Sequence, residues 1–445
     1  MTELAGEDAR TETDAASDLQ EVWPVLSTEE RLEGLRTFPP GEVEDFLLSL
    51  PARDQAELIL AMRPPERRFW MRLLPLDDAA DVIQAAPEEE REGLLALLDD
   101  SARKEVVALL AYAEDEAGGL MNPHYARLRP DMSVDEAITY LRRQARERLE
   151  TIYYVYVLDP EQRLLGVVTF RELFSAPPSK TVRDIMHTDV VVAHEEMDQE
   201  ALSRLFQEHN FLAIPVIDDE RHVKGIVTVD DIVDVVQEEA TEDIQKFGGM
   251  EALDAPYLDI AFGTMVRKRA GWLSALFIGE MLTATAMGHF EAEIARAVIL
   301  ALFVPLIISS GGNSGSQAST LVVRALALGE LKLRDWWRVV RRELAAGLVL
   351  GSILATIGFA RILTWQALFH PYGEHYMLVA LTVATSLIGV VTWGTLAGSM
   401  LPLLLRRLGF DPASASAPFV ATLVDVSGIV IYFTMASLFL GGTLL

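Results

Sequence analysis

The chain of 445 residues contains no cysteine, so disulfide bonds and thiolate metal sites are excluded. Basic residues are scarce, with 38 Lys and Arg against 66 Asp and Glu and a formal net charge of −28. Nucleic-acid partners are not expected, because phosphate binding needs clustered basic side chains. The first twenty residues lack an apolar run, so we expect no secretory signal peptide and interpret residues 1–20 as a disordered N-terminus.

Charge is distributed unevenly along the chain. Residues 261–445 contain 13 Lys and Arg and 9 Asp and Glu, so the first 260 residues hold 25 basic and 57 acidic groups, a formal charge of −32. Hydrophobic residues make up 50% of the whole chain. A strongly acidic half joined to an apolar half with few charges predicts one part in water and one part in a lipid bilayer.

Residues 21–117 are predicted to form an acidic, α-helical N-domain. Proline or Asp-rich breaks recur roughly every 11 to 14 residues, as at Pro51, Pro75 and Pro87, with helix-favouring stretches between them. Proline or aspartate is typical of a helix start. Short helices at this spacing indicate a helical-repeat solenoid, with an ordinary helical domain as the alternative; both are all-α.

A second repeat occupies residues 118–240. Two apolar strands and a helix start at residues 155–173 recur 59 positions further along the chain. The paired copies resemble a tandem CBS module, which implies an α/β regulatory domain that often binds adenosine nucleotides. The second copy has Thr228, whose hydroxyl could hold phosphate, and Asp231, whose carboxylate could hold ribose hydroxyls. Glu172 takes the aspartate position in the first copy, so one nucleotide site is expected to be better formed.

The rest of the chain, residues 270–445, is predicted to form a five-helix transmembrane domain. Each of its apolar runs reaches the length of about 20 residues that a helix needs to cross a bilayer. The predicted spans are residues 270–288, 294–317, 344–369, 376–405 and 412–445. Residues 241–269 are predicted to form a linking (plug) helix between the soluble and membrane parts.

Lys and Arg set the expected orientation, because they concentrate on the cytoplasmic side of membrane proteins. Eleven basic residues precede the first predicted span or lie in the second-to-third and fourth-to-fifth connections, whereas the opposite side has Arg296 and Arg361. We therefore expect a multi-pass plasma-membrane protein with its acidic half in the cytoplasm and its C-terminus outside.

Asp425 is the single ionisable residue in the last predicted span. A carboxylate at bilayer depth is costly, so it is expected to face water, an ion or a basic partner. Mg²⁺ prefers oxygen ligands, keeps most of its water and uses one or two carboxylates, whereas Zn²⁺ and Cu²⁺ favour His or Cys. Ligand chemistry therefore favours Mg²⁺ at Asp425, with Mn²⁺ and Co²⁺ as alternatives.

Small and polar residues end the second span and surround Asp425 in the fifth. Asn313 and Gln317 could contact the water around an ion, and plain helix packing is the alternative for their segment. Glu280, in the first span, either pairs across the bundle or lines a vestibule. The candidate pore-lining residues are Asn313, Gln317, Pro418, Ala421, Thr422 and Gly428.

The domain order and two segments, GGNSGSQ (311–317) and DPASASAPFVATLVDVSG (411–428), together resemble the MgtE family of magnesium channels. The resemblance implies a homodimer whose pore is lined by the second and fifth spans, with Asp425 as the ion-binding aspartate. Asp411 matches a cytoplasmic-side acid of the family. Ala417 departs from members that have asparagine at this position.

The resemblance also implies gating by cytosolic Mg²⁺ that bridges acidic surfaces of the N-domain, the CBS module and the linking helix. A half with a charge of −32 repels itself on compaction, and bound divalent cations would relieve this repulsion. Asp77 and Asp81 share a helix face at i,i+4 spacing. The regulatory candidates are Asp77, Asp81, Asp218, Asp219, Asp243, Glu251 and Asp411. Mg²⁺ is therefore expected as substrate and regulator, and ATP or another adenosine nucleotide as a further ligand.

Two other functions fit parts of the sequence. One is transport of a different divalent cation, and the other is a membrane-tethered nucleotide sensor without transport. Asp425 separates them, because a tether needs no intramembrane carboxylate. We do not expect an enzyme, because the sequence has no nucleophile–base pattern and no phosphate-cradling glycine loop.

Overall fold

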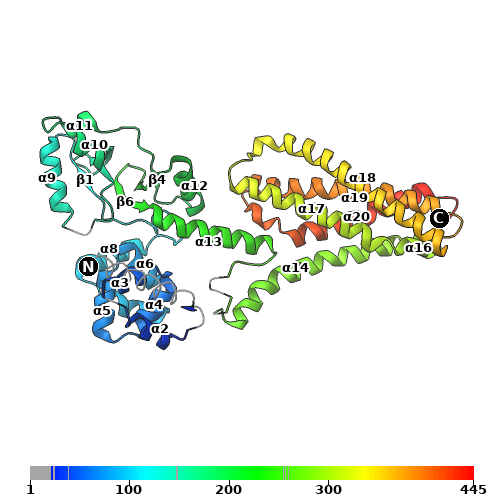
Figure 1. The fold of residues 1–445 in the computed structure, drawn as a ribbon, viewed down its shortest axis with the longest axis horizontal. Coiled ribbons are helices and arrows are strands. Elements are labelled where there is room, and N and C mark those ends of the chain that lie inside the picture. The colour runs from blue at the N-terminus through cyan, green and yellow to red at the C-terminus, as the bar shows by residue number, and fades with distance from the viewer. Residues whose placement is uncertain are drawn as a thin grey trace, which may run out of the picture. The chain divides into compact units, whose positions relative to one another are not determined.

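The computed structural model of this protein describes residues 22–23, 26–38, 40–146, 149–253, 255, 257–258 and 260–444. The N-terminus predicted to be disordered, residues 1–20, lies outside these residues. The chain divides into two compact units, Met1–Gln237 and Glu238–Leu445 (Figure 1). An all-α N-domain and an α/β repeat make up the first unit and long apolar helices the second, which confirms the predicted fold class.

Seven short helices build the described part of the N-domain. Most begin at or just after a proline, or after Ser27 or Asp99, because these residues satisfy or dispense with free amides of the first turn. The Ser27 hydroxyl accepts from the Glu30 amide, for example. The helices are α2 (Thr28–Leu35), α3 (Pro40–Leu48), α4 (Ala52–Ala61), α5 (Pro64–Leu73), α6 (Leu76–Ala85), α7 (Glu88–Leu95) and α8 (Asp100–Leu109).

The tandem repeat predicted for the next segment is confirmed by two three-stranded sheets of the same topology. In each sheet a short strand pairs in parallel with the second strand, which pairs antiparallel with the third. The register shifts after Val157 in one copy and after Val216 in the other, again 59 positions apart. The strands are β1 (Arg127–Leu128), β2 (Tyr154–Leu158), β3 (Leu164–Thr169), β4 (Ala193–His194), β5 (Ala213–Ile217) and β6 (Val223–Thr228). The helices are α9 (Val134–Gln144), α10 (Phe170–Ser175), α11 (Val182–Ile185), α12 (Gln199–His209) and α13 (Val229–Phe247).

One apolar cluster joins the N-domain to the second copy of the repeat. Val82 and Ile83 of α6 are buried in it together with Leu202, Ile214 and Ile232 of that copy. Full burial of such a side chain stabilises by roughly 1.5–3 kcal/mol. The shared core brings α6 and the start of α13 together, and their acidic residues with them.

The structure does not form the single linking helix predicted over residues 241–269. Instead, α13 ends at Phe247 and α14 (Phe262–His289) is a separate helix; the described residues between them are not helical. Gly248 and Gly249 follow α13, and Gly249 has a φ of 77°, a left-handed value that only glycine adopts at little cost.

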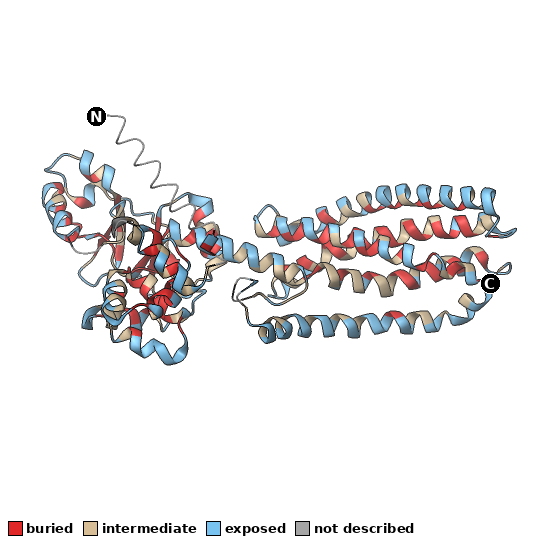
Figure 2. Cartoon of the chain, turned by 60° about the horizontal axis from the view of Figure 1, so that its bottom comes forward, coloured by how far each residue is buried: buried red, intermediate tan, exposed pale blue. Residues whose placement is uncertain are grey.

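Five helices of the described residues are long and apolar enough to cross a membrane, which confirms the predicted number of spans. Figure 2 shows buried faces gathered on three of them, α17, α19 and α20, whereas α14 is the least buried. The long helices after α14 are α17 (Val304–Ala327), α18 (Trp336–Phe369), α19 (Tyr376–Arg407) and α20 (Ala417–Leu440). Short helices connect them: α15 (Glu291–Arg296), α16 (Val298–Ala301), η2 (Leu333–Asp335) and η3 (Pro412–Ser414).

Helix α19 packs against α17, α18 and α20. Its Gly394 and Gly398 meet the carbonyl oxygens of Gly311 and Gly315 on α17 so closely that a side chain at either position would clash. Small residues four apart let two membrane helices approach in this way. One face of α17 thus serves packing, which leaves its other face to the polar residues of the same segment.

Candidate functional site

Asp425 lies against α17, eight residues after the first residue of α20. Its Oδ1 is 3.7 Å from the position that a Cβ on Gly312 would occupy, and the Ala421 Cβ is 3.4 Å from the same point. The two helices therefore cross at Gly312, and the half-buried carboxylate faces a residue without a side chain. Ser416 fixes the start of α20, because its hydroxyl accepts a hydrogen bond from the Phe419 amide (3.3 Å).

No base neutralises Asp425 among the described residues. The ion pairs of the membrane unit include those of Lys246 and of Arg338, and both residues pair with other acids. Arg361, inside α18, instead lies over the Trp365 ring at 4.5 Å from its centroid. A membrane carboxylate without a basic partner requires water or an ion beside it.

A polar stripe runs along the exposed face of α17 next to this carboxylate. Ser309, Asn313 and Gln317 follow one another at four-residue spacing, and all three are exposed in the protomer. The Asn313 Nδ2 donates to the Ser309 Oγ at 3.5 Å. Exposed amides in a membrane helix are stable only where water or a partner covers them. Two of the predicted pore-lining residues, Asn313 and Gln317, thus lie on one accessible face.

The other predicted pore-lining residues divide into two groups. Pro418, Ala421 and Thr422 lie half-buried on α20 within two turns of Asp425, and the Thr422 hydroxyl donates to the Pro418 carbonyl (3.0 Å). Gly428 does not belong with them, because it is buried against Val390 of α19.

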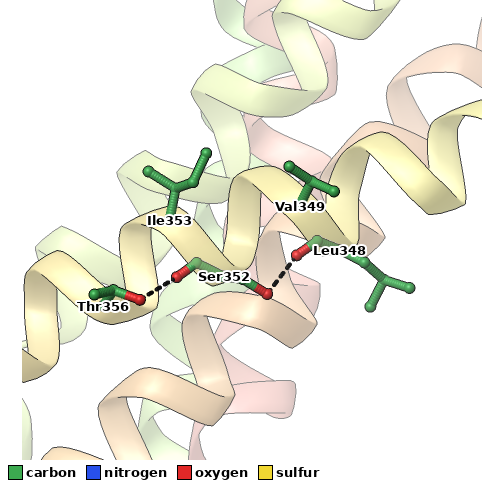
Figure 3. Close-up of a pocket in the computed structure, with 5 residues that line it drawn as sticks. All are labelled: Leu348, Val349, Ser352, Ile353 and Thr356. Carbon is green, nitrogen blue, oxygen red and sulfur yellow. Dashed lines mark hydrogen bonds between the residues drawn. The ribbon is translucent and has the colours of Figure 1, made fainter.

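A hollow of about 410 Å³ lies on α18 (Figure 3). The hydroxyls of Ser352 and Thr356 donate to backbone carbonyls of the same helix, at 2.7 Å and 2.8 Å. The remaining lining residues, Leu348, Val349 and Ile353, are apolar. This hollow therefore offers no site for a cation.

A second group of carboxylates lies in the first unit, where α6 meets the repeat. Asn122 joins two of them, since its Nδ2 donates to the Asp77 Oδ1 (3.0 Å) and to the Glu150 Oε2 (2.8 Å). Its own Oδ1 accepts from the His124 amide (2.8 Å), so the amide group is fixed in orientation. Asn122 and Asp77 are only 3% and 6% exposed. We call this group the acid cluster; it comprises Asp77, Asp78, Glu150, Asp230, Asp231 and Asp234.

Crowding in the acid cluster changes its protonation. Burial raises the pKa of Asp77 well above its usual range, and the charges of Asp231, Asp78 and Glu150 raise it further. Burial, followed by the neighbouring carboxylates, also raises the pKa of Asp78, Glu150 and Asp231 to about 7 each. Groups that titrate near neutral pH respond to small changes in proton or cation concentration.

Comparisons with known proteins match both units of this chain. The MgtE model, a divalent cation transporter, matches residues 304–435; the MgtE intracellular N domain matches 15–115; and the CBS domain matches 117–179 and 182–238. A magnesium transporter MgtE of Thermus thermophilus is 40% identical over 426 residues, which is 95% of this chain and 92% of the relative. This chain belongs to the MgtE family.

Other members of the MgtE family are similar over most of the chain. The magnesium transporter MgtE of Enterococcus faecalis is 34% identical over 76% of this chain and 72% of its own. That of Bacillus subtilis is 33% identical over 78% and 74%. A crystal structure of the cytosolic domain of the Mg²⁺ channel MgtE in complex with ATP is 41% identical and covers 49% of this chain and 90% of that chain, with a TM-score of 0.47.

In this MgtE-family chain, the two candidate nucleotide-binding residues, Thr228 and Asp231, form hydrogen bonds with each other. The Thr228 Oγ1 donates to the Asp231 Oδ2 (2.8 Å), and the Thr228 amide donates to the same oxygen (3.2 Å). Thr169 and Glu172 make the same bond in the first CBS copy (2.8 Å). These bonds satisfy amides at a helix start. The structure therefore places Asp231 in the acid cluster and in a helix cap.

Two acids predicted as regulatory ligands lie in one turn of the second CBS copy. The Asp218 Oδ2 is 3.0 Å from the His222 Nδ1 and 3.1 Å from the Lys224 Nζ. Burial alone would raise the pKa of Asp218, but the hydrogen bonds from His222 and Lys224 outweigh it and hold the pKa well below its usual range. Asp219 is exposed beside it. Asp218 is thus already balanced by bases, unlike Asp77.

The remaining regulatory candidates are spread over α6 and the connection into the membrane unit. Asp81 is half-buried on α6, and Asp243 is half-buried on α13. The Glu251 side chain lies 3.8 Å from the position of a Cβ on Gly271 of α14. The Asp411 Oδ1 accepts from the Ala413 amide (2.8 Å), and its Oδ2 pairs with the Lys246 Nζ (2.8 Å).

Sequence reasoning missed Asn122 and four acids of the acid cluster around Asp77, which are Asp78, Glu150, Asp230 and Asp234. Their contacts join positions 45 and 28 residues apart, and no local pattern reveals such pairs. Across the described residues, no three His, Cys, Asp or Glu side chains form a ready-made metal site. A hydrated Mg²⁺ needs only one or two carboxylates, so it does not require such a group.

Proposed function

We propose that this protein carries Mg²⁺ across the plasma membrane and is gated by Mg²⁺ in the cytoplasm. The observation that supports transport most directly is Asp425, an intramembrane carboxylate without a described base, beside an exposed polar stripe. Relatives named magnesium transporters match both units, which favours Mg²⁺ over Mn²⁺ and Co²⁺ as the ion. A hydrated Mg²⁺ would accept Asp425 and the amides of Asn313 and Gln317 as outer contacts.

The functional form is proposed to be a homodimer. Ser309, Asn313 and Gln317 cannot face hydrocarbon without a large cost, so this stripe needs an aqueous or protein neighbour. A second copy related by a two-fold axis would place the same stripe and a second Asp425 opposite the first. The ion would then pass between two carboxylates while retaining most of its water.

Gating is proposed to reside in the acid cluster. Burial, and then repulsion between neighbouring carboxylates, raises the pKa of Asp78, Glu150 and Asp231 to about 7, so these groups are partly protonated at neutral pH. A divalent cation that binds where α6 meets α13 would replace those protons and stabilise the packed arrangement. In this proposal a high cytoplasmic Mg²⁺ concentration therefore favours the packed, closed state, and a low concentration favours the open state.

Adenosine nucleotide binding at the CBS pair is a separate proposal, supported by the two CBS matches. A nucleotide at Thr228 and Asp231 would have to replace the hydrogen bonds that these residues make with each other. Titration of the purified protein with ATP by calorimetry tests it, and an unchanged heat on Asp231→Asn would place the nucleotide elsewhere.

Transport is tested with full-length protein in liposomes that contain a fluorescent Mg²⁺ indicator. Asp425→Asn keeps the side-chain shape and removes the charge, so Mg²⁺ entry should fall at least about 100-fold if the carboxylate sits in the path. Glu374→Gln, in the exposed turn before α19, is the matched control and should transport normally. Normal entry through Asp425→Asn would refute the proposed path.

Orientation is tested separately in cells. A reporter fused to the C-terminus should be accessible from outside, and one fused to the N-terminus should not, as the eleven-to-two distribution of basic residues favours. A C-terminal reporter that is reached only from the cytoplasm would contradict this topology.

A further inference from the structure

Glu280 follows Gly279, the residue at which α14 approaches α20. Its neighbour Gly279 is so close to α20 that an added Cβ would be 3.0 Å from the Thr422 Cγ2. The first and fifth spans run in the same direction across a membrane. Along their axes, Glu280 and Asp425 are about 1.5 Å and 4.5 Å beyond this contact, at 1.5 Å per residue. The two carboxylates therefore lie at similar depth.

The charges of Glu280 and Asp425 are close enough to interact. No ion pair of the described residues includes Glu280; those of the membrane unit involve Lys246 or Arg338, for example. The two acids thus repel each other without a base between them. Such a pair is stable at bilayer depth only where water or a cation reaches both groups.

The residues near Glu280 on α14 include both exposed apolar side chains and a buried hydroxyl. Phe277 and Met281, its exposed neighbours on α14, are 68% and 58% exposed and suit contact with lipid. Thr283, one turn further, is only 7% exposed, and its Oγ1 has no hydrogen-bond partner among the described residues. A helical threonine usually bonds to the carbonyl four residues earlier. An unused buried hydroxyl near Glu280 therefore adds a second polar group to α14.

We propose that Glu280 is a specificity-determining residue of the ion pathway, a second carboxylate that favours divalent over monovalent cations at Asp425. This proposal rests on the proposed function, because it assumes that ions pass Asp425. The Coulomb attraction of a carboxylate for a cation doubles when the cation's charge doubles. Removing Glu280 should therefore weaken the attraction for Mg²⁺ about twice as much as the attraction for Na⁺.

The test measures Mg²⁺ entry into liposomes over a range of Mg²⁺ concentrations, with and without competing Na⁺. For Glu280→Gln we expect the half-saturating Mg²⁺ concentration to rise about five- to tenfold and maximal entry to stay within about twofold. Na⁺ should compete more effectively than in the wild type. Glu280→Asp should keep most of the wild-type preference, and Glu291→Gln, an exposed acid on α15, is the matched control.

An unchanged half-saturating concentration and an unchanged preference over Na⁺ in Glu280→Gln would overturn this proposal. The proposed function would still stand in that case if Asp425→Asn had lost transport. Normal transport by Asp425→Asn would instead refute the pathway itself. If Glu280→Gln does not fold, Glu280→Ala decides: a raised half-saturating Mg²⁺ concentration supports the proposal, and wild-type behaviour overturns it.

Discussion

In the first unit (Met1–Gln237), which we propose to lie in the cytoplasm and call the cytoplasmic unit, the carboxylates of Asp77 and Glu150 share one buried amide, that of Asn122. In the membrane unit, Asp425 is half-buried and Glu280 is exposed, and neither forms an ion pair with a described base. A carboxylate that is hydrogen-bonded within the protein changes its protonation state when its neighbours or the pH change. A carboxylate that the protein leaves unsatisfied must exchange water and ions.

This contrast indicates that the acidic residues of the two units have different roles. The first 260 residues hold 57 acidic groups, so packing them together generates repulsion that a proton or a cation can relieve. The last 185 residues hold only 9, and two of these, Glu280 and Asp425, lie within the spans close enough for their charges to interact. The cytoplasmic carboxylates therefore suit a sensor, and the membrane carboxylates suit a path.

The largest effect is expected when pH and Mg²⁺ are varied together. The pKa values of Asp78, Glu150 and Asp231 are raised to about 7, so their contribution to stability is fully present below the unfolded values near 4 and is lost as pH rises through 7. Without divalent cations, the cytoplasmic unit should therefore resist protease at pH 5.5 and be cleaved rapidly at pH 8. The loss should exceed the roughly 1.4 kcal/mol that one pKa unit represents.

Mg²⁺ sharpens the same experiment. At pH 8, millimolar Mg²⁺ should restore protection of the full-length protein, whereas Na⁺ at equal ionic strength should not. At pH 5.5, Mg²⁺ should have little effect, because the carboxylates are already protonated. Equal digestion at pH 5.5 and pH 8, with and without Mg²⁺, would contradict the proposed contrast between the two units, because the acid cluster would then respond to neither protons nor cations.

A smaller but still large effect is expected from Asn122→Leu. This change leaves Asp77 and Glu150 without their shared donor in a buried place, and a buried polar group left without its hydrogen-bond partner costs about 1–3 kcal/mol. The denaturation midpoint of the cytoplasmic unit, followed by urea titration of the whole protein, should fall accordingly. Gln207→Leu, an exposed amide on α12, is the control and should shift stability by less than about 0.5 kcal/mol. An equal midpoint for both variants would show that the amide does not hold the cluster.

The two units also differ in how far the sequence predicts them. The five spans and Asp425 follow from hydropathy and one isolated charge, because a bilayer penalises every exception along a single helix. The CBS repeat follows from two similar strand pairs 59 positions apart. Domain class was therefore predictable from local patterns in both units.

The acid cluster was only partly predictable. Asp77 was named as a candidate, but its partners Asn122 and Glu150 come from distant segments that only the tertiary fold brings together. Asp231 was predicted to bind nucleotide. In the structure it forms a capping hydrogen bond with Thr228 and lies close enough to Asp77 of α6 for their charges to interact. The prediction of one helix over residues 241–269 was wrong, because α13 ends at Phe247, directly before Gly248 and Gly249.

A more modest change is expected from Asp78→Asn. The substitution removes one repelling charge from the cluster while keeping the side-chain shape, so at pH 8 without divalent cations the unit should become more stable by about 1 kcal/mol. The stabilisation by Mg²⁺ should shrink by a similar amount. Glu89→Gln, an exposed acid on α7, is the matched control and should leave both quantities unchanged. Lower stability of Asp78→Asn without divalent cations would mean that Asp78 is held by attraction and not strained by repulsion.

The smallest effect is expected from Lys246→Gln, which removes the base that pairs with Asp411. Lys246, at the end of α13, pairs with Asp411 (2.8 Å) and with Glu242, and its side chain is 30% exposed. Half-exposed ion pairs contribute about 0.2–1 kcal/mol, so the melting temperature should change little. The bond from the Ala413 amide to Asp411 remains, but the turn before α20 loses its tie to α13. We therefore expect faster hydrogen exchange over residues 411–416, with Lys104→Gln on α8 as the unaffected control.

In 1 M salt, which screens exposed charges beyond about 3 Å, the wild type should exchange as fast as the variant. Identical exchange of both proteins at low salt would show that Lys246 does not restrain this turn, and Asp411 would then no longer serve as a paired acid to contrast with Asp425.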